Sequence, residues 1–141
     1  MASVFSMIIN GDLPGRFVWK DERCVAFLSI SPIQPGHTLV VPHDEVDHWL
    51  DLDEDLLAHL SNVSRSVGKA IQQAFNPRKV GLMVAGLEVA HVHLHLIPIQ
   101  DEARDLNFAN ADANPAPSDL DAAAQQIRSA LRGLGYSQVS D

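Results

Sequence analysis

The stretch His91-Val92-His93-Leu94-His95-Leu96-Ile97-Pro98 decides both the expected fold and the expected chemistry of this chain. Successive side chains of a β-strand point to opposite faces of a sheet, so the three histidines would share one face and the apolar residues between them the other. The apolar face fits the core of a protein. On the histidine face, imidazoles would lie about 6.6 Å apart, which is two rises of about 3.3 Å along the strand.

A row of imidazoles can serve three purposes. Solvated or hydrogen-bonded histidines on an exposed sheet face would need no ligand at all. A metal site would need ligands from other segments, such as His37, His43 and His48, because the outer two histidines lie about 13 Å apart and Zn–N bonds are about 2.1 Å long. The third purpose is nucleophilic catalysis, since a neutral imidazole is a good nucleophile near pH 7 and neighbouring imidazoles can fix its tautomer.

The segments around this strand predict an α+β fold. β-Branched and aromatic runs predict further strands, and one apolar stripe with three- and four-residue steps predicts a long helix. That helix would begin at an Asp51–Glu54 capping box and end at Asn76-Pro77. The expected elements are a short helix from Ser3 to Asn10, strands over 16–20, 24–28, 37–41, 80–85 and 89–97, a long helix over 54–75, an extended, mobile loop over 98–117, and a last helix from Ser118 to Gly133.

The order of these elements favours an antiparallel sheet of about five strands with helices on one face. Strands come in an early run with one long helix inserted, and they do not alternate strictly with helices. We expect residues 1–100 to form the main fold. Residues 101–141 would add a C-terminal loop and helix to the same single domain.

Composition excludes several classes of protein. Ten Lys and Arg against eighteen Asp and Glu give a net charge of −8 over 141 residues, which argues against binding to nucleic acid or to an anionic membrane. The one cysteine, Cys24, excludes an intrachain disulfide and a zinc site built from cysteines. No apolar run approaches the roughly 20 residues that span a bilayer, and the N-terminus lacks the features of a signal peptide. We therefore expect a cytoplasmic protein.

The histidine stretch resembles the signature of the histidine triad (HIT) family, in which three histidines alternate with apolar residues, and every position fits. The resemblance extends over about the first hundred residues. Residues Phe5–Pro14 are similar to the family's opening helix, and Asp21–Phe27 with Ile30–Pro32 to its first hairpin and the loop after it. Residues Pro35–Pro42 are similar to the next strand. The resemblance therefore implies a HIT domain over residues 1–100.

HIT proteins are nucleotidyl hydrolases and transferases that work through a covalent nucleotidyl-histidine intermediate, without a metal or other cofactor. The resemblance implies that His93 is the nucleophile, which attacks the α-phosphorus of a nucleoside 5′-phosphate derivative. His95 would contact that phosphate and help to protonate the leaving group, while His91 and His37 would hold the surroundings by hydrogen bonds. The substrate would be a purine nucleotide, an adenosine derivative above all, with an amine or a phosphate as leaving group. The base pocket would be formed by Phe5, Ile8, Phe27 and Ile30, positions that also fit a plain core.

Three segments depart from the family pattern. Ser29 stands where the family usually has an acidic residue that holds the ribose hydroxyls, and a serine can make only one of those bonds. Gly86-Leu87-Glu88-Val89 replaces a Gly-Gln-Ser-Val type of loop, so its backbone N–H groups would have to face the phosphate. Glu88 would turn toward a histidine or solvent, because a carboxylate repels phosphate. Ser3 and Ser6 occupy the positions of a Cys-x-x-Cys pair that binds structural zinc in some relatives, so no such zinc is expected.

The intact triad favours an enzyme, and two other classes stay open. Ser29 and the changed loop are compatible with a non-catalytic nucleotide-binding or interaction module, and the histidine face with a metal-dependent protein. The resemblance also implies a homodimer with two equivalent active sites, since a small antiparallel sheet has an edge to protect. Leu57 and Ala58 broaden the apolar stripe of the long helix and offer a second contact surface. The alternative is a monomer whose edge is covered by residues 118–133.

Overall fold

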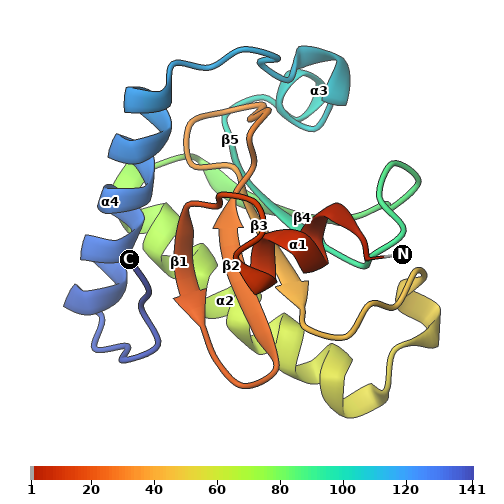
Figure 1. Ribbon diagram of the computed structural model, residues 1–141. Coiled ribbons are helices and arrows are strands. Elements are labelled where there is room, and N and C mark those ends of the chain that lie inside the picture. The colour runs from red at the N-terminus through yellow and green to blue at the C-terminus, as the bar shows by residue number, and fades with distance from the viewer. Residues whose placement is uncertain (1) are drawn as a thin grey trace.

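The computed structural model describes residues 2–141 and contains a five-stranded antiparallel sheet (Figure 1). The strands are β1 (Phe17–Lys20), β2 (Cys24–Leu28), β3 (Thr38–Pro42), β4 (Lys79–Val84) and β5 (Leu94–Ile99). Their order across the sheet is β1-β2-β3-β5-β4, so β5 returns to the centre of the sheet between β3 and β4. The predicted α+β class is confirmed.

Helices cover both faces of this sheet. They are α1 (Val4–Asn10), α2 (Glu54–Phe75), α3 (Glu102–Asp105) and α4 (Pro117–Gly133), with short 3-10 helices η1 (Trp49–Asp51) and η2 (Phe108–Asn110). The short helix predicted from Ser3 to Asn10 is α1, which Ser3 caps, and Asn76 ends α2 in the left-handed conformation with φ of 49°. The predicted capping box is wrong, because Asp51 lies in η1 and the N-cap residue of α2 is Asp53, which makes no side-chain capping bond.

Alternate residues of the central strands belong to two hydrophobic clusters, one on each face of the sheet. The even-numbered residues of β2 pack with apolar side chains of α2 and α4. Val25 and Phe27 point the other way and pack with Phe5 and Ile8 of α1. Figure 1 shows α1 in front of the sheet and α2 behind it. The prediction of helices on one face is therefore wrong for α1, because β2 and β3 are buried on both faces and need a second cover.

The histidine stretch lies only partly in a strand. β5 begins at Leu94 and pairs with β3 only over Leu94–Leu96, whereas a strand over 89–97 was expected. The amide of Val92 donates to the carbonyl of Val46 at 2.7 Å, so the chain before β5 has left the sheet ladder. Val92 nevertheless packs in the same cluster as Leu94 and Leu96. The predicted alternation of apolar and histidine side chains thus survives without strand pairing.

The segment after β5 has more structure than predicted. Residues 98 and 99 still belong to β5, and α3 and η2 follow where an extended loop was expected. Asp101 caps α3 and Asn107 caps η2 through their side-chain oxygens. Both devices are local and too short to leave an apolar period in the sequence.

The two edges of the sheet differ. Beside β1, the amide of Lys20 donates to the carbonyl of Gln138 and the amide of Ser140 to that of Val18. Helix α4 packs against α2 and lies beside the edge strand β1 (Figure 1). Within residues 2–141, no strand pairs with the outer edge of β4, where Leu82 is 56% exposed. No helix in this described part of the chain has the length and hydrophobicity to cross a membrane.

Candidate active site

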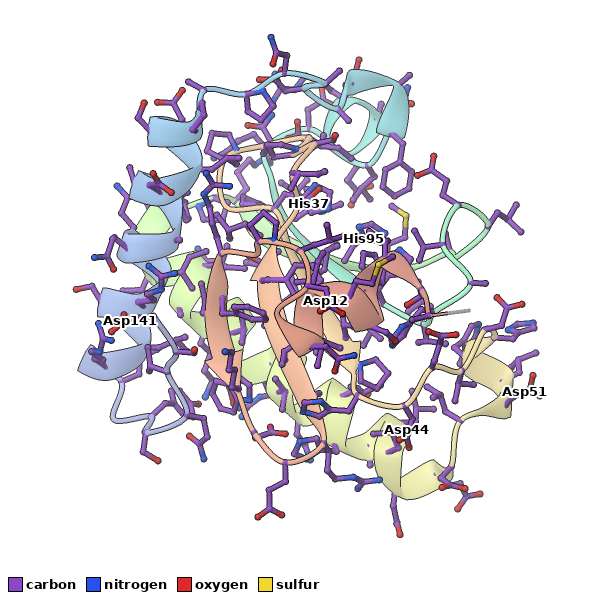
Figure 2. All side chains as sticks on the ribbon, in the orientation of Figure 1. Asp12, His37, Asp44, Asp51, His95 and Asp141 are labelled. Carbon is purple, nitrogen blue, oxygen red and sulfur yellow. The ribbon has the colours of Figure 1, made fainter. Side chains whose placement is uncertain are left out.

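Four histidine side chains gather on the α1 face of the sheet. His91 and His93 come from the segment that leads into β5, and His95 is the second residue of β5. His37 precedes β3, and Figure 2 labels it together with His95. All four are buried. The ring centroids of His93 and His95 lie 4.8 Å apart, and those of His37 and His95 lie 5.2 Å apart. The structure thus brings together all four residues predicted for catalysis.

Backbone groups set the tautomers of His37 and His95. The amide of Ile33 donates to Nδ1 of His37 at 3.1 Å, so the ring hydrogen of His37 is on Nε2. That Nε2–H donates to Nδ1 of His95 at 2.9 Å. His95 therefore carries its own hydrogen on Nε2, where it can donate to a bound group.

The tautomers of His91 and His93 follow in the same way, because a carbonyl can only accept. His91 Nε2 donates to the carbonyl of Pro42 at 2.8 Å, which leaves Nδ1 to accept from the hydroxyl of Ser3 at 2.7 Å. His93 Nδ1 donates to the carbonyl of His91 at 2.8 Å. The lone pair of His93 therefore lies on Nε2, which has no partner among the described residues.

Burial lowers the pKa of three of these rings, His37, His93 and His95, and so favours their neutral forms. Burial and the neighbouring imidazoles lower the pKa of His37 to about 4 and the pKa of His95 to about 3. Burial also lowers the pKa of His93, against the opposing effects of its bond to the carbonyl of His91 and the charge of Glu88. A neutral imidazole with a free lone pair is the nucleophilic form. The lowered pKa and the bond at Nδ1 thus favour a neutral His93 ring whose Nε2 lone pair is free.

A buried aromatic cluster adjoins His93. The ring of Phe5 lies edge-on to that of His93 at 4.8 Å and to that of Phe27 at 5.6 Å. Ile8 completes a buried cluster with these rings. Ile30, the fourth residue predicted for a base pocket, lies outside this cluster and is 71% exposed.

The loop before the triad is open. Gly86 adopts a positive φ of 100°, and Leu87 is fully exposed, so its side chain makes no wall for a phosphate. Glu88 is exposed, as expected, and close enough to His93 for its charge to raise the pKa of that ring. Val89 packs against the α1 cluster. Ser29 is half-buried, and its hydroxyl oxygen accepts from the amide of Ser31 at 3.2 Å.

The serine pair near the N-terminus forms a hydrogen-bonded cluster with Glu45 and His91. Ser3 accepts from the amide of Ser6 at 3.0 Å while its hydroxyl donates to His91. Glu45 accepts from the amide of Ser3 and from the hydroxyl of Ser6. Neutral hydroxyls are poor zinc ligands compared with thiolates, and these groups already satisfy one another, so the cluster does not fit a zinc ion. From the sequence, Ser3 marks the start of a helix and the position of a zinc-binding cysteine in some relatives, and nothing in its local pattern points to His91, 88 residues away.

A second polar cluster lies on the opposite, α2-facing side of the sheet. Ligand atoms of Asp21, Cys24 and His59 lie within 4.8 Å of one another. Asp21 Oδ2 accepts from Trp19 at 2.8 Å and from His59 at 2.9 Å, and Oδ1 accepts from the amides of Arg23 and Cys24. Burial raises the pKa of the Cys24 thiol well above its usual range. A protonated thiol beside a saturated carboxylate is a structural arrangement, not an open metal site.

Comparisons with known proteins agree with this geometry. Residues 10–102 match the HIT domain family. A HIT-like protein of Methanocaldococcus jannaschii is 37% identical over 67% of this chain and 77% of its own. An adenosine 5′-monophosphoramidase of Schizosaccharomyces pombe is 28% identical over 94% of this chain and all of its own. The crystal structure of a zinc-bound histidine triad protein from Mycobacterium smegmatis superposes with a TM-score of 0.80 at 26% identity, over 95% of this chain and 96% of that one.

The fold and the histidine cluster together define a HIT domain. The match covers more than half of the chain, and the aligned segment includes all three histidines of the triad. This chain belongs to the HIT family.

Proposed function

We propose that this protein hydrolyses adenosine 5′-phosphoramidates through a nucleotide bound covalently to His93. The observation that carries the proposal is the free lone pair on Nε2 of His93. Because Nδ1 of this ring donates to the carbonyl of His91, Nε2 is the nitrogen that remains available to react. The ring of His93 meets the ring of Phe5 and also that of His95, whose Nε2–H can donate. Positioning of this kind supplies a large part of the rate enhancement in phosphoryl transfer.

The adenine would pack beside Phe5, against the apolar cluster that Phe5 forms with Phe27 and Ile8. Phe5 contacts the ring of His93, so a base held there brings the α-phosphorus near Nε2. Backbone N–H groups of residues 86–89 would face the phosphate oxygens, since Leu87 and Glu88 point to solvent. Ser29 retains a hydroxyl hydrogen for one bond to the ribose.

In the first step, Nε2 of His93 forms a bond to phosphorus while the P–N bond of the substrate breaks. The amine nitrogen enters protonated and leaves as a neutral amine. Water then attacks phosphorus, frees His93 and passes one proton to solvent, so adenosine monophosphate and the amine are the products. His95 supports the departing nitrogen and the phosphate with a hydrogen bond from Nε2–H. To act as a full acid, His95 would first have to be protonated at Nδ1, and that nitrogen already accepts from His37. We therefore assign His95 a hydrogen bond to the leaving nitrogen and not a complete proton transfer.

An amine suits this site better than a polyphosphate as leaving group. Between Lys79 and Arg104 the chain contains no Lys or Arg, so no basic side chain from the triad segment meets additional phosphates. The fission yeast relative that aligns over nearly the whole chain is named an adenosine 5′-monophosphoramidase. Both points support phosphoramidates over dinucleoside polyphosphates.

We also propose that two copies of this chain form a homodimer through the β4 edge of the sheet. The outer edge of β4 carries the exposed Leu82, and a shallow groove beside it runs between β4 and α2. Ser64 lines this groove, and its buried hydroxyl has no hydrogen-bond partner among the described residues. A second copy paired along β4 would continue the sheet and cover the groove.

Chemical trapping tests the proposal. Wild-type protein is mixed with adenosine 5′-phosphoramidate, denatured within the first turnover at alkaline pH and weighed by mass spectrometry. We expect one added adenylyl group on His93. The His93→Ala variant should stay folded, show no adduct and lose turnover by about 10³-fold or more, as removal of a nucleophile does.

The matched control is His48→Ala, which removes an exposed histidine outside the triad and should leave turnover unchanged. Tight binding of adenosine monophosphate with no adduct and no turnover would instead identify a nucleotide-binding module, the second function that Ser29 and the open loop allow.

A further inference from the structure

An aromatic residue outside the predicted site lies against the triad. The ring of Phe108 in η2 meets that of His95 edge-on, with centroids 5.0 Å apart. Phe108 follows the last residue that matches the HIT domain family, and it is 41% exposed. Phe108 therefore contacts His95 while part of its own ring remains exposed.

The position of Phe108 relates it to the leaving group of the proposed reaction. Four rings follow one another in contact: Phe5, His93, His95 and Phe108, with centroids 4.8, 4.8 and 5.0 Å apart. In an in-line displacement the nucleophile and the leaving group lie on opposite sides of phosphorus. Because His95 is assigned above to support the departing nitrogen, the leaving group lies next to His95, the ring that Phe108 contacts.

The segment that carries Phe108 is anchored to the protein. Asp105 is fully buried and accepts from the side chain of Gln34 at 2.7 Å and from the amide of Gln100 at 2.7 Å. The amide of Asp112 donates to the carbonyl of Pro32 at 2.9 Å. These bonds tie both sides of η2 to residues 32–34, next to the amide of Ile33 that fixes the tautomer of His37. Phe108 thus belongs to a wall with a defined place beside the triad.

The charge around this wall favours an amine. Residues 101–112 contain four carboxylates and one arginine, and Arg104 is engaged by Asp105 at 2.8 Å. Asp101, Glu102 and Asp112 are exposed. An acidic rim repels a phosphate leaving group, while an aromatic face attracts both apolar groups and ammonium ions.

We infer that Phe108 determines leaving-group specificity by forming the wall of a subsite for amines with an aromatic or other bulky apolar body. The inference rests on the proposed function, because it assumes a phosphoramidate cleaved at His93. Phe108 touches the leaving group and takes no part in the chemical step.

Two substrates that differ only in the amine test the inference. One is adenosine 5′-phosphoramidate, which releases ammonia, and the other carries an arylethylamine in place of ammonia. In Phe108→Ala we expect kcat/KM for the arylethylamine substrate to fall about 3- to 10-fold, as loss of one aromatic contact implies. The value for the ammonia substrate should stay within about twofold of wild type, because ammonia does not reach the wall. Phe108→Tyr keeps the ring and should behave as wild type.

Leu134→Ala is the matched control, since Leu134 is 42% exposed and follows α4 on the opposite face of the sheet. An equal fall for both substrates in Phe108→Ala, or no fall for either, would overturn the inference. Binding of both compounds to the His93→Ala variant separates the two proposals. If wild-type protein shows no turnover but its binding still prefers the arylethylamine compound in a way that depends on Phe108, the proposed function is wrong and the subsite is supported. If wild-type protein turns over both substrates but Phe108→Ala leaves the preference between them unchanged, the subsite is wrong and the proposed function stands.

Discussion

Each face of the sheet carries a polar cluster, and the two clusters differ in what they leave unpaired. On the α1 face, backbone groups use one nitrogen of His93 and leave the other free. On the α2 face, Asp21 accepts from Trp19, His59 and Cys24 and from two backbone amides, so no acceptor position is left open. Donors and acceptors that satisfy one another stabilise a fold, whereas a fixed group with a free lone pair can react. The comparison predicts that one cluster controls activity and the other stability.

The largest effect on stability is expected from Asp21→Ala. This change leaves the indole of Trp19, the ring of His59 and two amides near the β1–β2 turn without their acceptor. The free energy of unfolding should fall by about 3 kcal/mol, since each buried donor without a partner costs about 1–3 kcal/mol and water can reach some of them. Urea unfolding followed by circular dichroism measures the loss, and kcat/KM at a temperature where the variant is folded should be unchanged.

Asp51→Ala removes an equal charge from an exposed position and is the control for the loss of a carboxylate (Figure 2). A drop in kcat/KM for Asp21→Ala, with the fold intact, would contradict the separation of the two clusters.

The two clusters should also respond to different ranges of pH. In the folded state the pKa of His37 is about 4 and the pKa of His95 is about 3. In the unfolded chain the same side chains take up protons below about pH 6.5, so between these values they are neutral when folded and charged when unfolded. Each therefore makes stability fall as the pH drops below about 6.5, by about 1.4 kcal/mol per pH unit between about pH 6 and pH 4. Burial raises the pKa of Asp21, but hydrogen bonds led by that from Trp19 outweigh it and lower the pKa to about 2. Its contribution is present above about pH 4 and is lost as the pH falls toward 2.

Urea unfolding between pH 7 and pH 4.5 checks this difference. In His95→Asn the slope of stability against pH should be smaller by about 1.4 kcal/mol per unit, whereas Asp21→Asn should keep the wild-type slope in this range. An unchanged slope in His95→Asn would mean that this imidazole is charged in the folded protein.

The sequence predicted the repetitive parts of the molecule and missed contacts between distant segments. The stripe of α2 and the alternation around His93 are periodic, so their elements and their buried faces could be predicted. The start of β5 could not, because it depends on where Val92 leaves the ladder to bond Val46. The same holds for the place of Phe108 beside His95, which depends on a buried aspartate bonding a distant glutamine. Periodicity reports burial within an element, whereas these contacts depend on tertiary structure.

The smallest predicted effect concerns Ser3, the residue that links α1 to the triad. Its hydroxyl donates to Nδ1 of His91, whose carbonyl in turn accepts from His93. Ser3→Ala removes this bond and the cap on α1, so stability should fall by about 1 kcal/mol. We also expect kcat to fall about threefold, since a loss of about 0.6 kcal/mol in the positioning of His93 corresponds to that factor.

Two variants separate positioning from simple loss of stability. Ser6→Ala removes the bond to Glu45 but touches no histidine, so it should lower stability without changing kcat. Ser3→Thr keeps a hydroxyl that can cap α1 and donate to His91, and it should restore kcat. If Ser3→Ala and Ser6→Ala lower stability equally and both keep wild-type kcat, the serine cluster only anchors α1. A selective loss of kcat in Ser3→Ala, recovered in Ser3→Thr, would show that α1 helps to aim the nucleophile. The activity of the histidine cluster on the α1 face would then depend on the hydrogen bond from the Ser3 hydroxyl, whereas the Asp21 cluster on the α2 face would not.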